Sequence, residues 1–409
     1  MKTTSKLNFG LMLFVAMVSV SFIIVPDGNG WRGPNRDGKI TGFEVPASWP
    51  VQLNMLWQVN VGLGDASPLL ADGKIYLHTR KENSEIALCI NAATGKIIWE
   101  KVNNPAPEVT GGAASHPGPR STPAVAHGKV FNVGAGGHLT CRNAATGDLI
   151  WESTAYTGEV PQFFVSCSPL IVGNKCIVHL NGKENGTIVA FDVETGSEIW
   201  KIRGEASTYS SPVLMPAFEN MVVVQGETDL LGVSLENGKL LWKYPTPGET
   251  RFYNSSTPII DRDKIIIAGQ GKGTKMLKVK KSGTDYTVEE VWQNTEMGVS
   301  FNSPVLKDGY IYGNEARFGY LYCLNAQTGE KCWVDTVKHN RFASMLDAGQ
   351  IMVSLPATGN LLFFNPDPKS YKEVKTYKVA ETEVYAHPIL DKNRIYVKDK
   401  EHLTNWGFR

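Results

Sequence analysis

The chain has 409 residues, of which 42% are hydrophobic and 20% charged, so it can form a large core and is not broadly disordered. Its 41 basic and 40 acidic side chains give a net charge of +1, which argues against a general nucleic-acid-binding protein. The 40 glycines and 22 prolines are spread along the chain, as many short turns require.

The first 28 residues have the pattern of an export signal. Lys2 and Lys6 precede an apolar run over residues 9–25, as in a signal peptide with a basic start and an apolar centre. The run is short for a membrane-spanning helix, and no Ala-x-Ala cleavage site follows it. We therefore predict that residues 1–28 are a signal peptide or an uncleaved N-terminal anchor. The chain would contact a membrane only through such an anchor. The remainder of the chain is expected in the periplasm or cell envelope.

One unit recurs along the rest of the chain. It contains a Ser-Pro or Thr-Pro pair, an apolar pair, a turn, two alternating runs, a Thr-Gly turn and a tryptophan. The copies begin at Ser67, Thr122, Ser168, Ser211, Thr257, Ser303, Ser344 (a degraded copy) and His387. A spacing of about 46 residues with four short strands per copy is typical of a propeller blade.

The ends of the chain complete this pattern. The last copy lacks its fourth strand, and residues 53–61 carry a lone strand with Trp57 at the position that ends a blade. Joining the two removes the unpaired sheet edges. We predict an all-β fold: an eight-bladed β-propeller of four-stranded antiparallel blades over residues 53–409, closed by an N-terminal strand and preceded by a lead-in segment, residues 29–52.

The tryptophans that end the copies are expected to pack between neighbouring blades, where each buries a large apolar surface. These docking residues are Trp57, Trp99, Trp151, Trp200, Trp242, Trp292 and Trp333, and Tyr377 takes the equivalent place in the seventh copy.

The turn and its tryptophan resemble a known repeat. The runs N-A-A-T-G-K-I-I-W at residues 91–99 and F-D-V-E-T-G-S-E-I-W at 191–200 are similar to the A-x-D-x-x-T-G-x-x-x-W tryptophan-docking motif of the pyrroloquinoline quinone (PQQ) propeller superfamily. The run W-R-G-P-N-R-D-G at residues 31–38 resembles the opening of exported PQQ-binding-like bacterial propellers.

The resemblance implies two kinds of function. Quinoprotein dehydrogenases of this superfamily bind PQQ and Ca²⁺ over the central channel and oxidise alcohols or sugars, whereas scaffolds such as BamB are not enzymes. This chain has no adjacent cysteine pair, which many alcohol-oxidising members carry, and no cysteine after the apolar run, unlike the lipoprotein BamB. We therefore expect a binding scaffold for an envelope protein, a polar small molecule or a glycan, and a PQQ- and calcium-dependent dehydrogenase is the alternative. Fold alone does not decide between them.

Polar loop residues are expected to converge on one face around the channel. Those before the first strands of the blades are Asp65, Arg120, Tyr209, Arg251, Asn254, Asn302, Arg341 and His387. Those between the second and third strands are Arg80, Glu227, Gln270, Glu315, Arg317 and Asp399. Such a rim suits an anionic or polyhydroxylated ligand, because arginine offers a planar donor fork to carboxylates. The opposing interpretation is that loops are polar because they are solvated.

In a quinoprotein, Ca²⁺ would take oxygen ligands from Glu227 or Glu315 with Asn254 or Asn302, and Asp65 or Asp399 would be the base. The longest connection, residues 101–120, is expected to lie over the channel face or to contact a partner.

Overall fold

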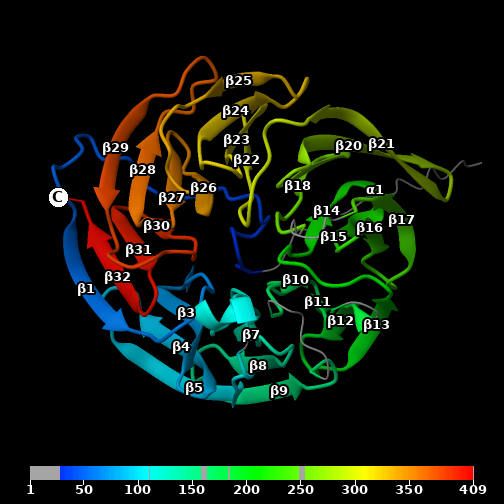
Figure 1. Ribbon diagram of the computed structural model, residues 1–409. Helices are drawn as coiled ribbons and strands as arrows, with labels where there is room; N and C mark the ends of the chain where they lie inside the picture. Colours follow the sequence, from blue (N-terminus) through cyan, green and yellow to red (C-terminus); the bar gives the residue numbers. More distant parts are fainter. Residues whose placement is uncertain (1–27, 110, 158–163, 183–184, 248–253, 409) are drawn as a thin grey trace, which may run out of the picture.

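The computed structural model describes residues 28–109, 111–157, 164–182, 185–247 and 254–408. They form a ring of eight four-stranded antiparallel sheets, which confirms the predicted eight-bladed propeller (Figure 1). The predicted signal peptide or anchor falls almost entirely outside the described residues. Within the ranges above, no helix has the length and apolar character needed to cross a membrane.

The first half of the ring contains blades 1–4. Blade 1 consists of β2 (Leu69–Ala71), β3 (Lys74–Lys81), β4 (Ser84–Asn91) and β5 (Ile97–Pro105). Blade 2 consists of β6 (Ala124–Ala126), β7 (Lys129–Val133), β8 (Leu139–Asn143) and β9 (Leu149–Ser153). Blade 3 consists of β10 (Leu170–Val172), β11 (Lys175–Leu180), β12 (Thr187–Asp192) and β13 (Glu198–Arg203). Blade 4 consists of β14 (Val213–Met215), β15 (Met221–Gln225), β16 (Asp229–Ser234) and β17 (Leu240–Pro245).

The second half contains blades 5–8. Blade 5 consists of β18 (Ile259–Asp261), β19 (Lys264–Gly269), β20 (Gly273–Ser282) and β21 (Asp285–Asn294). Blade 6 consists of β22 (Val305–Lys307), β23 (Tyr310–Asn314), β24 (Leu321–Asn325) and β25 (Lys331–Val334). Blade 7 consists of β26 (Ala343–Asp347), β27 (Met352–Pro356), β28 (Asn360–Phe364) and β29 (Glu373–Lys378). Blade 8 consists of β30 (Ile389–Asp391), β31 (Arg394–Lys398), β32 (His402–Gly407) and β1 (Asn54–Asn60).

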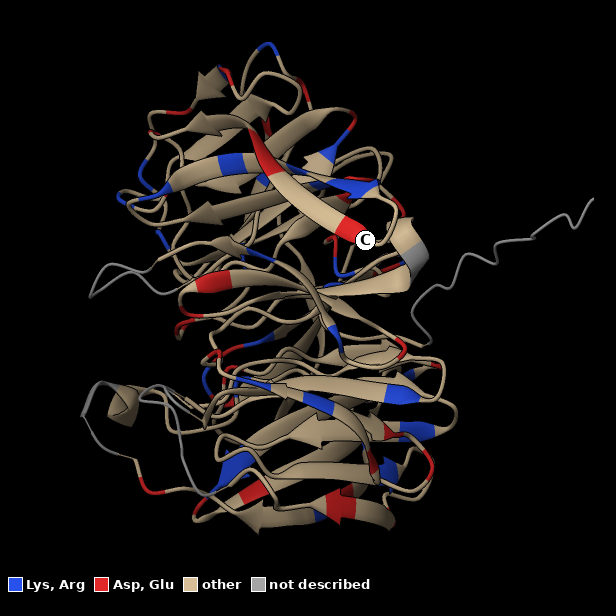
Figure 2. Cartoon of the chain, turned by 90° about the vertical axis from the view of Figure 1, so that its right-hand side faces the viewer, with Lys and Arg blue, Asp and Glu red and all other residues tan. Residues whose placement is uncertain are grey.

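Two short helical turns lie between strands, the 3₁₀ turn η1 (Gly111–Ser115) before blade 2 and α1 (Ala217–Asn220) within blade 4. Seen from the side, basic and acidic residues are interspersed along the strands and loops of the blades (Figure 2).

The ring closes as the sequence predicts. Strand β1 pairs antiparallel with β32, with Asn60 opposite His402 and Met55 opposite Trp406. Blade 8 therefore takes its outermost strand from the N-terminal part of the chain, and no blade is left with three strands.

The docking tryptophan of one blade packs against the Thr-Gly turn of the next blade. Gly147 has φ +76°, and a Cβ atom placed on it would lie 2.7 Å from the ring of Trp99, so the turn needs glycine for both its backbone and its contact. The indole Nε1–H of Trp99 donates to the carbonyl of Ala144 at 3.1 Å. The same bond joins Trp57 to Ala92, Trp151 to Val193, Trp200 to Leu235, Trp292 to Ala326 and Trp333 to Asp367.

The joint between blades 4 and 5 departs from this pattern. Blade 5 has no Thr-Gly turn, because β20 and β21 instead continue as a hairpin of ten residues on each side. Trp242 therefore donates to the Met221 sulfur of its own blade, at 3.2 Å. In blade 7, the Tyr377 hydroxyl donates to the carbonyl of Pro50 in the lead-in segment at 2.9 Å.

The lead-in segment crosses the central channel. Asn29 forms a β-bridge with Val125 in β6, and Lys39 forms one with Asp347 at the end of β26. Residues between these bridges contact the inner strands, and the segment is visible in blue at the centre of the ring (Figure 1). The segment therefore closes the channel as a plug.

Two buried arginines fix this plug. Arg32 donates to the carbonyls of Ser303 and Pro304 of blade 6, at 2.7 and 2.8 Å. Arg36 donates to the carbonyls of Ser168, at 3.0 Å, and Pro169 of blade 3. Burial lowers the pKa of each guanidinium to about 10, so both remain charged at neutral pH.

Candidate functional site

A belt of side-chain hydrogen bonds surrounds the upper end of the channel, where the first strands begin. The backbone N–H of Ser67 donates to the Thr122 hydroxyl of the next blade at 3.0 Å, and His387 N–H donates to the Ser67 hydroxyl at 2.8 Å. The same bond runs from Thr122 to Ser168, Ser168 to Ser211, Ser211 to Thr257 and Thr257 to Ser303. Blade 7 interrupts the belt, because Ala343 lines the channel there without a hydroxyl. The belt explains why the copies begin with Ser-Pro or Thr-Pro.

Above the belt lies a cavity of about 520 Å³. Segments before the first strands of all eight blades line it, and Trp31 of the plug closes it from the channel side. This volume falls in the usual range of small-molecule sites, about 300–1,000 Å³. Six residues that the sequence nominated line it: Asp65, Arg120, Tyr209, Asn302, Arg341 and His387.

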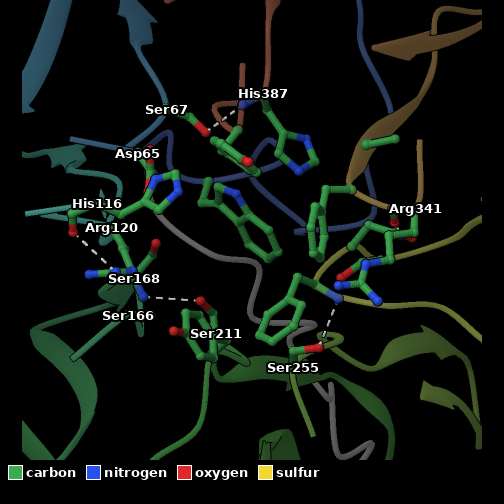
Figure 3. A pocket seen from close by; sticks show the side chains of 18 residues that line it. Asp65, Ser67, His116, Arg120, Ser166, Ser168, Ser211, Ser255, Arg341 and His387 are labelled. Atoms are coloured by element: carbon green, nitrogen blue, oxygen red, sulfur yellow. Dashed lines mark hydrogen bonds and ion pairs between the residues drawn. The ribbon is translucent and has the colours of Figure 1, made fainter. Parts of the chain in front are cut away.

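One side of the cavity is polar. His116 Nδ1 lies 3.0 Å from Asp65 Oδ2, and this hydrogen bond raises the pKa of His116. Arg120 donates to the His116 carbonyl at 3.1 Å, and its guanidinium lies over the Phe164 ring at 4.9 Å. In Figure 3, Asp65, His116 and Arg120 lie together, and Arg341 lies on the opposite side of the cavity. The connection over residues 101–120 thus reaches the channel face. This is the first of the two placements that the sequence predicts for it.

The other side is aromatic. The rings of Tyr209 and Phe301 lie 5.1 Å apart, those of Phe301 and Phe342 5.7 Å, and those of Phe342 and Tyr385 5.9 Å. Tyr385 in turn meets the His116 ring edge-on at 4.7 Å. We call these four aromatic residues the aromatic arc.

Phe301 is the exposed member of the arc. The residue is 43% exposed, and its backbone has a left-handed φ of +51°. Its N–H donates to the Ser255 hydroxyl at 3.1 Å, which holds this strained backbone (Figure 3). Non-glycine residues in this region cluster at functional sites.

Comparison with known proteins places the chain in a family. Residues 82–335 match the sequence profile of the family described as outer membrane protein assembly factor BamB. The chain belongs to this family. BamB from Yersinia pestis is 24% identical over 336 residues, which cover 77% of each chain.

Redox enzymes with the same repeat are also relatives of this BamB-like chain. Subunit 1 of methanol dehydrogenase [cytochrome c] from Methylorubrum extorquens is 30% identical over 165 residues, and the match spans 37% of this chain but a quarter of that protein. The quinohemoprotein alcohol dehydrogenase structure from Comamonas testosteroni superposes with a TM-score of 0.71 at 14% identity, covering 93% of this chain and 80% of that one. This likeness shows a shared fold.

Four nominated residues lie away from the cavity of the BamB-like propeller. Glu227 is exposed, and Glu315 accepts the backbone N–H of Arg317 at 2.6 Å within its own loop. Asn254 points elsewhere, since its amide oxygen accepts from Lys272 Nζ at 2.6 Å. The loops between second and third strands share the channel face but lie further from its axis, which is why Glu227, Glu315 and Arg317 miss the cavity.

The remaining nominated loop residues have local structural contacts. Arg80 holds the 101–120 connection by donating to the Pro107 and Pro117 carbonyls, both at 3.1 Å. Gln270 accepts from Ser300, and Asp399 accepts the N–H groups of its own turn. Arg251 lies outside the described residues.

These positions do not fit a calcium ion at the cavity. Ca²⁺ needs about six to eight oxygen ligands, yet the proposed ligands Glu227, Glu315 and Asn254 are dispersed as described above. Asp65 is the lining carboxylate, and it is bonded to His116. Across the ranges that the structure describes, no group of three or more His, Cys, Asp or Glu side chains could hold a metal.

Sequence reasoning missed the remaining cavity wall. It overlooked Trp31, His116, Ser166, Ser255, Phe301, Phe342 and Tyr385. Three of these carried an available signal: Trp31 belongs to the W-R-G-P-N-R-D-G run, Phe301 precedes Asn302, and Phe342 follows Arg341.

Proposed function

We propose that this BamB-like propeller is a binding protein of the cell envelope that holds an anionic organic ligand in the channel-mouth cavity. One observation carries the proposal: the pre-strand segments of all eight blades converge on a half-open cavity that is lined by Arg120, Arg341 and His116 against one lining carboxylate, Asp65. The charges of Arg32 and Arg36 below Trp31 add to the positive potential. Cationic groups in a low-dielectric cavity attract an anion strongly.

A titration separates this proposal from the quinoprotein alternative. The purified protein is titrated with PQQ, alone and with Ca²⁺, while tryptophan fluorescence and melting temperature are followed. Anion binding predicts quenching of Trp31 and a raised melting temperature that do not depend on Ca²⁺. Binding that requires Ca²⁺, with dye-linked oxidation of an alcohol or sugar, would instead support the dehydrogenase.

A second candidate function is docking of an envelope protein, and the perimeter of the ring favours it. Exposed apolar pairs precede the docking tryptophan in three neighbouring blades, 8, 1 and 2. They are 39–52% exposed and comprise Met55, Leu56, Ile97, Ile98, Leu149 and Ile150. We call this set the apolar rim. Contiguous exposed apolar surface marks protein interaction sites.

Crosslinking in intact cells tests the rim. Ile98→Glu with Ile150→Glu is expected to abolish a crosslinked complex that the wild-type protein forms. Val337→Glu is the matched control, because Val337 is 54% exposed but lies outside the rim. Equal crosslinking by all three proteins would exclude the rim as the docking surface.

A further inference from the structure

Four buried polar atoms on residues that line the cavity have no hydrogen-bond partner within the described ranges. They are Arg120 Nη1, Ser166 Oγ, Asn302 Oδ1 and His387 Nδ1. Ser166 and Asn302 are 7% and 4% exposed, so bulk water does not readily solvate them. An unpartnered buried polar group costs about 1–3 kcal/mol. Four on residues that line one cavity motivate the proposal below, in which these side chains rotate toward a ligand that supplies the missing bonds.

The chemistry of these atoms is mixed. Arg120 Nη1 is a charged donor and calls for an anionic acceptor. Asn302 Oδ1 is an acceptor, because Nδ2 of the same amide donates to the carbonyls of Ser300 and Arg341 at 3.2 and 3.1 Å and so fixes its orientation. Burial lowers the pKa of His387 to about 3, so the imidazole is neutral and offers one acceptor nitrogen. The Ser166 hydroxyl serves either role.

The positions of these groups separate the two chemistries. Arg120 and Ser166 lie on the same side of the cavity, and Arg341, whose carbonyl holds Asn302, lies opposite them (Figure 3). His387 lies between the two sides, edge-on to Trp31 at 5.3 Å. A ligand that spans the cavity therefore needs an acidic group at one end and hydrogen-bond donors along the rest.

We propose that the ligand is a hydroxylated carboxylic acid of the sugar-acid class, such as a uronate, with its carboxylate at Arg120 and its hydroxyls at Asn302, His387 and Ser166. The aromatic arc and Trp31 supply apolar surface for the C–H faces of a sugar ring. A polycarboxylate without hydroxyls, or a quinone tricarboxylate, satisfies the arginine but leaves the Asn302 acceptor unpartnered. This inference rests on the proposed anion site and specifies its ligand.

Calorimetric titration of the purified protein tests the ligand class. The probes are galacturonate, galactose and tricarballylate, which differ in having both groups, hydroxyls alone and carboxylates alone. Galacturonate is expected to bind at least tenfold more tightly than either of the others. Equal binding of galacturonate and tricarballylate would overturn the sugar-acid inference and leave the anion site standing, whereas no binding of any acid, PQQ included, would overturn both.

Variants locate the site. Ser166→Ala removes a buried hydroxyl that has no partner in the fold, so stability should be equal or higher, while galacturonate affinity falls severalfold and tricarballylate affinity is retained. Asn302→Leu should lower galacturonate affinity at least tenfold, with far-UV circular dichroism as the folding check. Arg317→Gln is the matched control, because Arg317 is exposed on the same face outside the cavity. Unchanged galacturonate affinity in Ser166→Ala and a folded Asn302→Leu would overturn the assignment.

Discussion

The plug and the cavity use arginine in opposite ways. In the plug, Arg32 and Arg36 place both terminal nitrogens on carbonyls of blades 6 and 3. In the cavity, Arg120 keeps one terminal nitrogen buried and unpartnered, and Arg341 is exposed at the edge. The side chain is structural where both terminal nitrogens are bonded to carbonyls, and it is available for a ligand where one terminal nitrogen is not. Hydrogen bonding of the terminal nitrogens, more than burial, thus separates the scaffold from the site.

The same substitution, made once in the plug and once in the cavity, tests this difference between the arginines and should give the largest effects. Arg36→Met leaves the carbonyls of Ser168 and Pro169 buried without a donor, so we expect a loss of about 3–5 kcal/mol in the free energy of unfolding. Arg120→Met should cost less than about 1 kcal/mol but abolish anion binding. Urea unfolding and calorimetry measure the two effects. Equal destabilisation by both variants would contradict the distinction.

The buried carboxyl group of Glu85, in which one of the two oxygens accepts a hydrogen bond, gives a second test of how hydrogen bonding affects stability. Glu85 is fully buried, and its Oε1 accepts the Ala135 N–H at 2.9 Å. Its Oε2 has no hydrogen-bond partner within the described ranges and lies 3.7 Å from Nε2 of the buried His78. Burial raises the pKa of Glu85 to about 7. The folded state therefore holds this proton more tightly than the unfolded state, and stability should fall as pH rises from about 4.5 to 7, by roughly 3 kcal/mol.

Glu85→Gln isolates that contribution. The amide oxygen can still accept from Ala135, and the side chain no longer titrates. Urea unfolding at pH 5 and pH 8 should show a smaller decline for Glu85→Gln than for the wild-type protein. Parallel declines in the two proteins would mean that Glu85 is already ionised in the folded state at low pH.

The blade joints provide the next, smaller effect. Trp151→Phe removes the indole bond to the Val193 carbonyl and should cost about 1 kcal/mol for the lost bond, in addition to lost packing. Trp242→Phe removes only a contact with a thioether, a weak acceptor, so its cost should be smaller. Chemical unfolding of both variants tests this order, and a larger cost at Trp242 would show that the irregular joint depends on its indole as much as the regular ones.

The smallest expected effect is the pH dependence of binding. The hydrogen bond that His116 donates to the Asp65 carboxylate raises the pKa of His116, so the imidazole stays charged at pH values above its usual range. As pH rises through that pKa, the cavity loses a positive charge and keeps the negative charge of Asp65. Anion affinity should then fall severalfold, and His116→Phe should remove this step from the affinity-against-pH curve. An unchanged step in His116→Phe would assign it to another group.

The repeat made the fold predictable from sequence. Ser-Pro and Thr-Gly-Trp report contacts that every blade makes with its neighbour, so the closure by β1 and the number of blades follow from counting copies. The irregular contacts of Trp242 and Trp406 could not be predicted from the repeat. Trp406 lies in the third strand of blade 8 and donates to the Val379 carbonyl of blade 7 at 3.2 Å, a contact outside the repeated pattern.

The site was half predictable. Chain position before a first strand identifies which residues approach the channel axis, and Asp65, Asn302 and Arg341 line the cavity for this reason. Radial distance does not appear in the sequence, so loops such as that of Glu315 were nominated although they lie further out. The plug was also beyond the local pattern, because Arg36 finds its partners 132 and 133 residues away.

Ring closure also has a consequence in time. Gln58 of β1 donates to the Thr404 hydroxyl of β32 at 2.9 Å, across 346 residues of chain. In a chain delivered from its N-terminus, β1 therefore stays unpaired while seven blades assemble. Each end of the growing arc meanwhile exposes an open sheet edge. Such non-local pairing is slow. The ring cannot be completed before its last strand arrives, so closure itself reports that the whole propeller has been delivered.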